Sequence, residues 1–454
     1  MSSSLLRTLL SAVEAFRPVL TRPGFANALV VFAGWVLSQG RHAITEALVA
    51  TDVARRRDHA RFHRFFSRGT WSPDALGKVI FDRILRWVPL DGPIPIVLDD
   101  TLTPKKGPHV FGIGSHLDAV RSTRRFKVFT FGHVWVVLSV VVQFPFARRP
   151  WAIPVMFRIY RNLKECEGKG DTYRKKTELG REMVDLAATW AAGRRLHLAT
   201  DAAYCNATVL KDLPTTVTVF GSIRPDAVLT APPTTQPKRG RRRIRGERLP
   251  TPAALARNGR RPWEPHDAEL YGTRRTQQCK TIDAQWYRGC GAQLVRIVVV
   301  RTDSGAVPLR VYLCTDPTLT VTTILETYAG RWALEVTFRD LKQHLGFADS
   351  SARKRQAVER TAPFVGFIYA TLVLWFAESA HRSPLAAPPI RPWYRRKRYF
   401  SFADILRTAQ RVLASADILD PARSIENLQN STSRGASHAD RRRAAAFKAQ
   451  AQAA

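Results

Sequence analysis

The chain has 454 residues, which is enough for two or three domains around a sizeable buried core. Its 71 Lys and Arg against 37 Asp and Glu give a formal net charge of +34. This excess favours a polyanionic partner, nucleic acid first and an anionic membrane surface second. Five widely spaced cysteines include no C-x-x-C pair and no zinc spacing, which argues against a disulfide scaffold and predicts reduced thiols in a cytosolic protein.

Residues 1–90 are predicted to form a small basic helical domain. Apolar spacing predicts helices over 25–37 and 43–56, and Ser72 followed by Pro73 is typical of the start of a further helix. A basic helical domain ahead of a catalytic core suggests DNA binding. A helical cap that only packs on the core would give the same pattern.

Two apolar segments approach the length of a membrane span. Residues 128–146 are rich in β-branched residues and are interrupted by polar residues, Gly and Pro, which favours a long buried strand. Residues 363–380 are predicted to be helical but have too few apolar positions for a comfortable span. The first residues lack the pattern of a signal peptide. We therefore expect no membrane insertion.

The region from 91 to 226 alternates short strands and helices. Strands are predicted over 93–100, 126–146, 152–160, 196–200 and 216–223, and helices over 179–192 and 206–213. The first strand ends in Asp99 and Asp100, and the fourth is followed by Asp201. Charges at the end of a buried strand are costly unless they pair or bind a metal.

This order predicts an α/β fold with a ribonuclease-H-like mixed sheet core, made of residues 91–226 and 316–380. In that arrangement the first and fourth strands are neighbours, so Asp100 and Asp201 emerge side by side. Many strands end in Asp, so one such acid alone means little.

Residues 227–315 are predicted to be a β-rich insertion with a basic loop. Strands are expected over 277–287, 293–300 and 309–314. The loop contains the run Lys238–Arg245, with Arg239, Arg241, Arg242 and Arg243 as expected DNA-backbone contacts. Lys105 and Lys106, in the turn after the first strand, are expected to add to them. Trp286, and after it Trp263, could stack on an unpaired base, although ordinary sheet packing would explain both.

The segment 323–346 is predicted to be one helix. Thr323 and Glu326 have the spacing of a capping box, and Gly346 suits the left-handed position after the last turn.

One face of that helix carries four polar residues. Tyr328, Arg331, Glu335 and Lys342 fall within an arc of roughly 60° at about 100° per residue. A carboxylate among phosphate-binding groups suits a metal-dependent nuclease. An amphipathic helix with an Arg331–Glu335 pair is the alternative.

Residues 381–454 are predicted to be a basic C-terminal region. It contains the basic patch Arg391–Arg398 and a helix over 400–414, and we expect disorder from about residue 424.

The residues named above resemble the bacterial insertion-sequence transposases of the DDE superfamily, in the branch with the signature Y-x2-R-x3-E-x6-K. Tyr328, Arg331, Glu335 and Lys342 match that signature. Asp100 directly precedes Thr101, as the first aspartate of that branch does, which favours Asp100 over Asp99. Thr200 and Asp201 resemble the second-aspartate motif. The resemblance covers residues 55–380.

The resemblance implies cut-and-paste transposition, with cleavage through hairpin ends and joining to target DNA. Asp100, Asp201 and Glu335 would be the catalytic acids and would hold two divalent ions, Mg²⁺ or Mn²⁺ in its place. Tyr328, Arg331 and Lys342 would hold phosphates of the transposon end. The implied partners are double-stranded DNA, as terminal inverted repeats and target, and a second copy of the chain in a homodimeric synaptic complex. The implied location is the cytoplasm, in association with the nucleoid.

Two other readings stay open. A non-catalytic DNA-binding regulator would explain the charge but would leave the three carboxylates without a role. Another ribonuclease-H-like nuclease, such as a resolvase or a domesticated transposase, would cleave without joining.

Overall fold

A computed structural model describes residues 2–416 apart from 108, 124, 169, 238, 302–308, 348, 390–391, 394–396, 398 and 415. Most of the predicted basic patch Arg391–Arg398, Lys238 of the basic loop, and the disorder predicted after residue 424 lie outside the described residues.

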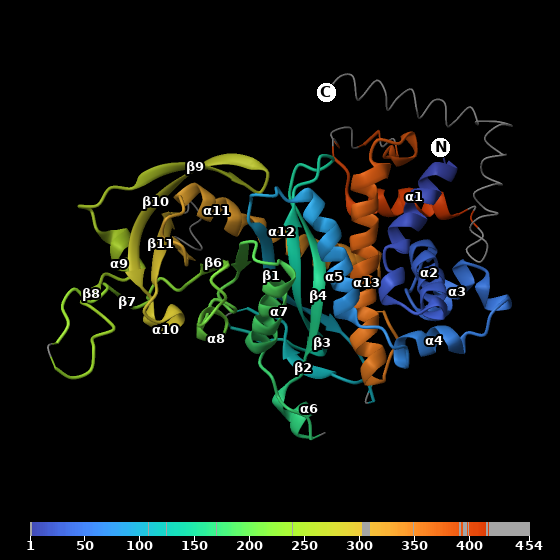
Figure 1. Cartoon of the computed structure of the whole chain (residues 1–454), viewed down its shortest axis with the longest axis horizontal. Helices are drawn as coiled ribbons and strands as arrows, with labels where there is room; N and C mark the ends of the chain where they lie inside the picture. Colours follow the sequence, from blue (N-terminus) through green and yellow to red (C-terminus); the bar gives the residue numbers. More distant parts are fainter. Residues whose placement is uncertain are drawn as a thin grey trace.

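The amino-terminal helices pack against the central part of the chain. They are α1 (Ser2–Glu14), α2 (Arg22–Leu37), α3 (Ile44–Ala50), α4 (Ala60–Ser67) and α5 (Pro73–Ile84). The predicted cap of α5 is present, since the Ser72 side chain accepts a hydrogen bond from the Asp74 N–H. Helices α1, α4 and α5 contact the buried helix α13 (Arg355–Trp375), as does the last described helix, α14 (Phe402–Leu413) (Figure 1). All of them share one hydrophobic core with the sheet.

The central sheet combines antiparallel and parallel pairing. Its strands are β1 (Ile94–Pro104), β2 (Gly114–Leu117), β3 (Phe129–Val142), β4 (Trp151–Tyr160), β5 (Leu196–Thr200) and β6 (Val217–Ser222). β3 pairs antiparallel with β1, β2 and β4, whereas β5 pairs parallel with β1 and β6. The expected adjacency of the first strand and the strand before Asp201 is therefore present. The short strand β2 was not predicted.

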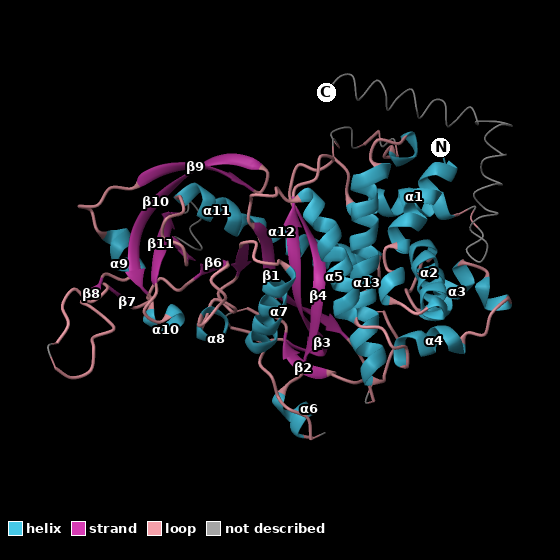
Figure 2. Cartoon of the chain, in the orientation of Figure 1, coloured by secondary structure: helices cyan, strands magenta, loops and turns pink. Residues whose placement is uncertain are grey.

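Helices lie on both faces of β1 (Figure 2). Helix α7 (Lys176–Trp190) covers one face, where Gly180 lets it approach the side chains of Leu98 and Tyr204. Helix α12 (Trp332–His344) meets the other face through Arg331, the residue before its first turn. Two short helices, α6 (Leu163–Glu167) and α8 (Ala207–Leu210), belong to the loops after β4 and β5.

The insertion is β-rich and continues the central sheet. It contains β7 (Leu229–Thr230), β8 (Arg248–Leu249), α9 (Pro252–Arg257), β9 (Glu264–Leu270), β10 (Thr273–Gln285), α10 (Tyr287–Cys290), β11 (Leu294–Arg301) and β12 (Leu309–Cys314). Strand β12 pairs with β6, so the described strands of core and insertion form one twelve-stranded sheet.

The segment predicted as one helix over 323–346 is two helices. Helix α11 (Val321–Gly330) ends at Gly330, and α12 starts two residues later. Glycine weakens a helix interior, and Arg331 at the break is held by contacts outside the helix. The predicted capping box is also wrong, because Thr320 is the N-cap and accepts from the Thr323 N–H. Gly346 has the expected positive φ, of 56°.

One described helix, Arg355–Ala380, is long and apolar enough by length and composition to cross a membrane. However, 94% of its apolar window is buried inside the protein, as in the core helix of a globular domain. The helix begins eight residues before the predicted start at Pro363, which the structure places inside it. All five cysteines are buried and free of disulfide bonds.

Candidate active site

The two adjacent aspartates of β1 point to opposite faces of the sheet. Successive side chains of a strand alternate between its faces, and Leu98 pairs in register with Thr200 of β5. The next position on each chain is Asp99 and Asp201, so these two carboxylates belong to the same face. Asp100 belongs to the other.

The Asp99 face also carries Arg331 and Glu335. One guanidinium nitrogen of Arg331 donates to Asp99 Oδ2 at 2.9 Å, and another donates to Glu335 Oε1 at 2.8 Å. A single arginine therefore bridges the acid on β1 and the acid on α12. The break between α11 and α12 places this arginine at the helix start, beside the strand.

Burial dominates the electrostatics of this face. Burial, reinforced by the negative charge of Asp201, raises the pKa of Asp99 to about 7, although Arg331 opposes the shift. Burial disfavours the charge of Arg331, but the surrounding Asp99, Tyr328 and Glu335 raise its pKa overall. The two aspartates thus repel each other, and a cation nearby relieves that repulsion.

Asp201 is held by the turn that follows β5. Its Oδ1 accepts hydrogen bonds from the backbone N–H groups of Ala203, at 2.9 Å, and Tyr204, at 3.2 Å. This turn directs the carboxylate before the chain enters α8.

Asp100 has cationic and hydroxyl partners on the α7 face. Lys176 Nζ donates to Oδ1 at 2.9 Å, and the Tyr204 hydroxyl donates to Oδ2 at 2.8 Å. Burial and the neighbouring carboxylate raise the pKa of Tyr204, so its hydroxyl stays protonated as a donor. Tyr204 consequently joins the two faces, because its N–H binds Asp201 and its hydroxyl binds Asp100.

Two other residues of the predicted signature lie near this site. Lys342, on α12, donates through Nζ to the Leu102 carbonyl of β1 at 2.8 Å, and burial lowers its pKa. The Tyr328 ring lies 5.8 Å from the Arg331 guanidinium carbon. Arg331 and Lys342 therefore contact β1 directly, whereas Tyr328 lies on α11 and packs on Tyr312 of β12, with ring centroids 4.4 Å apart.

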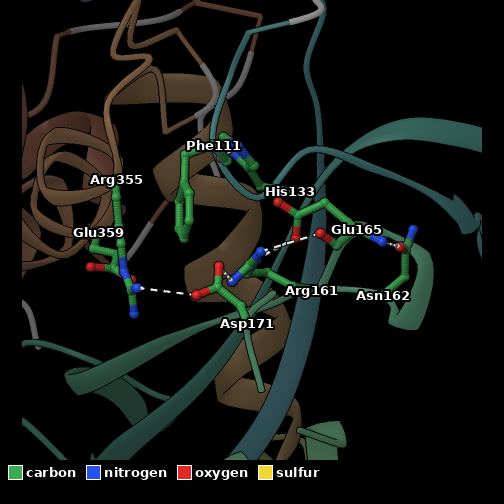
Figure 3. A network of polar contacts seen from close by, with 8 residues as sticks. All are labelled: Phe111, His133, Arg161, Asn162, Glu165, Asp171, Arg355 and Glu359. Atoms are coloured by element: carbon green, nitrogen blue, oxygen red, sulfur yellow. Dashed lines mark hydrogen bonds and ion pairs between the residues drawn. The ribbon is translucent and has the colours of Figure 1, made fainter. Parts of the chain in front are cut away.

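The loop after β1 is anchored by charged neighbours. The Phe111 ring lies between the guanidinium groups of Arg161 and Arg355, at 4.7 and 5.3 Å from its centroid (Figure 3). Lys105 is partly buried and donates to the Ser350 carbonyl, whereas Lys106 is exposed. Of the two lysines expected to contact DNA, Lys106 is the accessible one.

The basic loop of the insertion extends away from the rest of the molecule (Figure 1). The arginines predicted to contact DNA are all exposed: Arg239, Arg241, Arg242 and Arg243. The Gln236 side chain exchanges two hydrogen bonds with the backbone of Arg243, which braces the loop.

The predicted stacking tryptophans are both half-buried. Trp286 packs so closely on Gly289 that a Cβ there would lie 2.2 Å from the indole, and Lys280 lies 4.7 Å from the Trp263 ring. Sequence reasoning missed Trp332, which directly follows Arg331, is 45% exposed and contacts Tyr271 at the tip of the β9–β10 hairpin. The sequence did place Trp332 three residues before Glu335, on the same helix, and that spacing could have indicated a role near the site.

The donor set of this face suits a hard divalent ion, because carboxylate oxygens are the ligands that Mg²⁺ and Mn²⁺ prefer. Among the described residues, no group of three acidic, histidine or cysteine side chains stands close enough to hold one ion. The Arg331 guanidinium lies between Asp99 and Glu335. The residues therefore fit an ion by their chemistry, but Arg331 must release a carboxylate first.

Acidic side chains that follow or lie on adjacent parallel strands, next to cations and in a strongly basic chain, are compatible with a nuclease. A family model described as DDE superfamily endonuclease matches residues 15–291, more than half of the chain. The chain belongs to this family. The matched segment includes Asp99, Asp100 and Asp201 and ends before Glu335. No curated protein matches the sequence.

Proposed function

We propose that this protein is a cut-and-paste DNA transposase with a ribonuclease-H-like core. It would bind the ends of a mobile element, cleave them and join them to target DNA. The observation that supports this best is the convergence of Asp99, Asp201 and Glu335 on one face of β1, with Arg331 bridging two of them.

Asp99, rather than Asp100, is the first acid of the proposed site. The resemblance to related transposases favours Asp100, but strand alternation turns that side chain toward α7, away from Glu335. Asp100 instead supports the site, through Lys176 and the Tyr204 hydroxyl.

Asp99, Asp201 and Glu335 would hold two divalent ions, Mg²⁺ or Mn²⁺. When bound, such ions activate a water or a 3′-hydroxyl and stabilise the leaving oxygen in phosphodiester cleavage. The protein's own part is to present the carboxylates on one face of a rigid sheet. A DNA phosphate would draw Arg331 from the acids, since guanidinium pairs well with phosphate oxygens.

Other residues of the α11–α12 segment would contact the DNA. Lys342 and Tyr328 would accompany Arg331 in holding phosphates of the element end. In a hairpin route the freed 3′-hydroxyl attacks the opposite strand, which requires a displaced base to be held out of the stack. Trp332 is better placed for that than Trp286, because it is exposed and lies beside Arg331.

The partners follow from the same function. Inverted repeats at two ends call for two protein copies, so a homodimer on DNA is expected, acting in the cytoplasm in association with the nucleoid. The exposed arginines of the insertion loop would clamp the DNA backbone, with each phosphate contact adding roughly 0.9 to the slope of log K against log salt.

The test is cleavage of the DNA that flanks the gene, taken with its terminal repeats. The wild-type protein with Mg²⁺ should release labelled ends and yield strand-transfer products, and Asp201→Ala should abolish cleavage while DNA binding persists. Cleavage by Asp201→Ala at the wild-type rate would refute the site. Cleavage without any joined product would favour a nuclease that does not transpose.

A further inference from the structure

We infer that the β2–β3 hairpin is a second DNA-contacting surface, which takes unstacked bases on the same face of the sheet as the proposed active site. This inference rests on the proposed function for its DNA substrate. Five large apolar side chains of the hairpin are exposed, and together they are called the hairpin patch: Leu117, Val120, Phe126, Phe129 and Phe131.

The patch departs from what a folded domain usually leaves in water. Phe126, Phe129 and Phe131 are 69%, 65% and 64% exposed, whereas most other phenylalanines of the described chain are buried. Single exposed apolar residues are ordinary, but a contiguous group of them marks a binding surface. Leu117 pairs across the strands with Phe129, and Phe131 follows two residues later on the same face of β3, so these three side chains are adjacent.

The patch lies on the catalytic face of the sheet. Asp99 pairs with Val137 of β3, and the register runs regularly to Pro104 opposite Gly132. Phe131 and Val137 are six residues apart on β3. Side chains an even number of residues apart point to the same face of a strand, so both lie on one face, about 20 Å from each other. One strand thus extends from the position opposite Asp99 to the aromatic patch.

Cations surround the patch. Arg121, Arg125 and Lys127 are all exposed in the turn that connects β2 to β3. Asp118 is occupied within the turn, since it accepts from the N–H groups of Val120 and Arg121 and from Thr130, and lies 3.7 Å from the Arg121 guanidinium.

Aromatic rings among cations are the chemistry of single-stranded nucleic-acid binding, in which bases stack on the rings and cations follow the backbone. Phe129 and Phe131 stand about 6.8 Å apart along an antiparallel strand, twice the 3.4 Å spacing of stacked bases, so one base fits between them. A second copy of the chain is disfavoured, because a symmetric contact would bring the same cations together.

The hairpin is also held at its base, which reduces the ordering needed on binding. His133 Nε2 hydrogen-bonds the Phe111 carbonyl at 2.9 Å, and the Phe111 N–H donates to the Arg353 carbonyl at 2.9 Å. The ring of Phe111 is clamped between two arginines (Figure 3).

The experiment compares two probes without metal: a 30-base-pair duplex and the same duplex with a central four-base unpaired bubble containing 2-aminopurine. The wild-type protein should bind the bubble more tightly and quench its fluorescence. Phe129→Ser/Phe131→Ser should weaken bubble binding about tenfold and restore the fluorescence, while duplex binding changes less than twofold. Val49→Ser, which removes an equally exposed apolar side chain from α3, is the matched control and should behave as wild type.

Three outcomes would overturn the inference: bubble binding unchanged in the double variant, equal weakening on both probes, or sedimentation showing that the double variant loses a dimer without losing bubble binding. The result is separable from the proposed function. A wild-type protein that cleaves element ends without preferring the bubble refutes only this surface. Bubble preference without metal-dependent cleavage refutes the transposase instead.

Discussion

The two faces of β1 place neighbouring aspartates in different surroundings. Asp99 meets a second carboxylate, Asp201, and is neutralised by one arginine that it shares with Glu335. Asp100 meets a lysine and a tyrosine hydroxyl, each at hydrogen-bonding distance, and is fully paired. The Asp99 face holds three carboxylates and one arginine, which leaves negative charge for a cationic ligand. On the Asp100 face the carboxylate is paired with a lysine and a tyrosine of the same chain. The contrast is the basis for proposing Asp99 as a catalytic acid and Asp100 as a supporting residue.

The largest expected effect tests that contrast directly. Asp99→Ala should reduce Mg²⁺-dependent cleavage by on the order of 10³-fold or more, because it removes a carboxylate that we propose as a metal ligand. Asp100→Asn should cost about 10- to 100-fold, as losses of supporting hydrogen bonds do. Rates of end cleavage, with DNA binding as a control for folding, would measure both. A larger loss of cleavage in Asp100→Asn than in Asp99→Ala would indicate that Asp100 is the metal ligand, and would contradict the roles given to the two faces.

A smaller effect should come from the aromatic residue beside Arg331. Trp332→Ala should permit first-strand nicking but slow hairpin formation about tenfold, since stacking contributes about 1–3 kcal/mol per base. Trp286→Ala, which removes a half-buried indole, is the comparison. Denaturing gels would show the hairpin as a strand of double length. Hairpins formed at the wild-type rate by Trp332→Ala, but not by Trp286→Ala, would restore the insertion tryptophan to that role.

Tyr204→Phe sharpens the comparison, because Tyr204 links the two faces. The variant keeps the N–H bond to Asp201 and loses only the hydroxyl bond to Asp100. We expect about 1.5–3 kcal/mol lower unfolding free energy in urea, as for a hydrogen bond to a charged group, with cleavage reduced less than in Asp100→Asn. A cleavage loss as large as that of Asp99→Ala would show that the faces do not act separately.

The smallest expected effect is on acid stability. Burial lowers the pKa of His133 to about 4, with Lys105 and His116 adding to the shift and Glu165 and the Phe111 carbonyl opposing it. At His133 the folded state therefore binds fewer protons than the unfolded state between about pH 4 and 6.5. The stability that depends on His133 should be fully present above pH 6.5 and should fall by up to about 1.4 kcal/mol per pH unit below it.

Urea unfolding at pH 7.5, 6 and 5 would measure that slope, and His133→Asn should flatten it. Val134→Ala, a neighbouring buried change without a titrating group, should lower stability equally at all three values. An unchanged slope in His133→Asn would mean that other groups set the acid sensitivity.

Sequence patterns located the strands β1, β3, β4, β5 and β6, because buried strands are continuous apolar runs. The predicted end of the first strand at Asp100 was wrong, since β1 continues to Pro104 and both aspartates lie within it. The patterns left the choice between Asp99 and Asp100 to a resemblance. That choice depends on the register of β1 against β5, which pairing across the sheet determines and periodicity within one strand does not.

The α11–α12 break was missed for a similar reason. Gly330 weakens a helix, but the apolar period continues through it, and the contact that turns the chain is with Asp99, over two hundred residues away. The exposure of Trp332 and of the hairpin patch likewise depends on which elements cover them.

The Arg331 bridge has a consequence for when the enzyme can be active. An internal guanidinium competes with any ion for the same carboxylates at a high effective concentration, since it is tethered beside them. DNA that withdraws Arg331 would therefore strengthen ion binding, and by thermodynamic reciprocity bound ions would strengthen the grip on DNA. With the proposed function, the protein would therefore stay inactive on other DNA until its own substrate draws Arg331 away from the carboxylates.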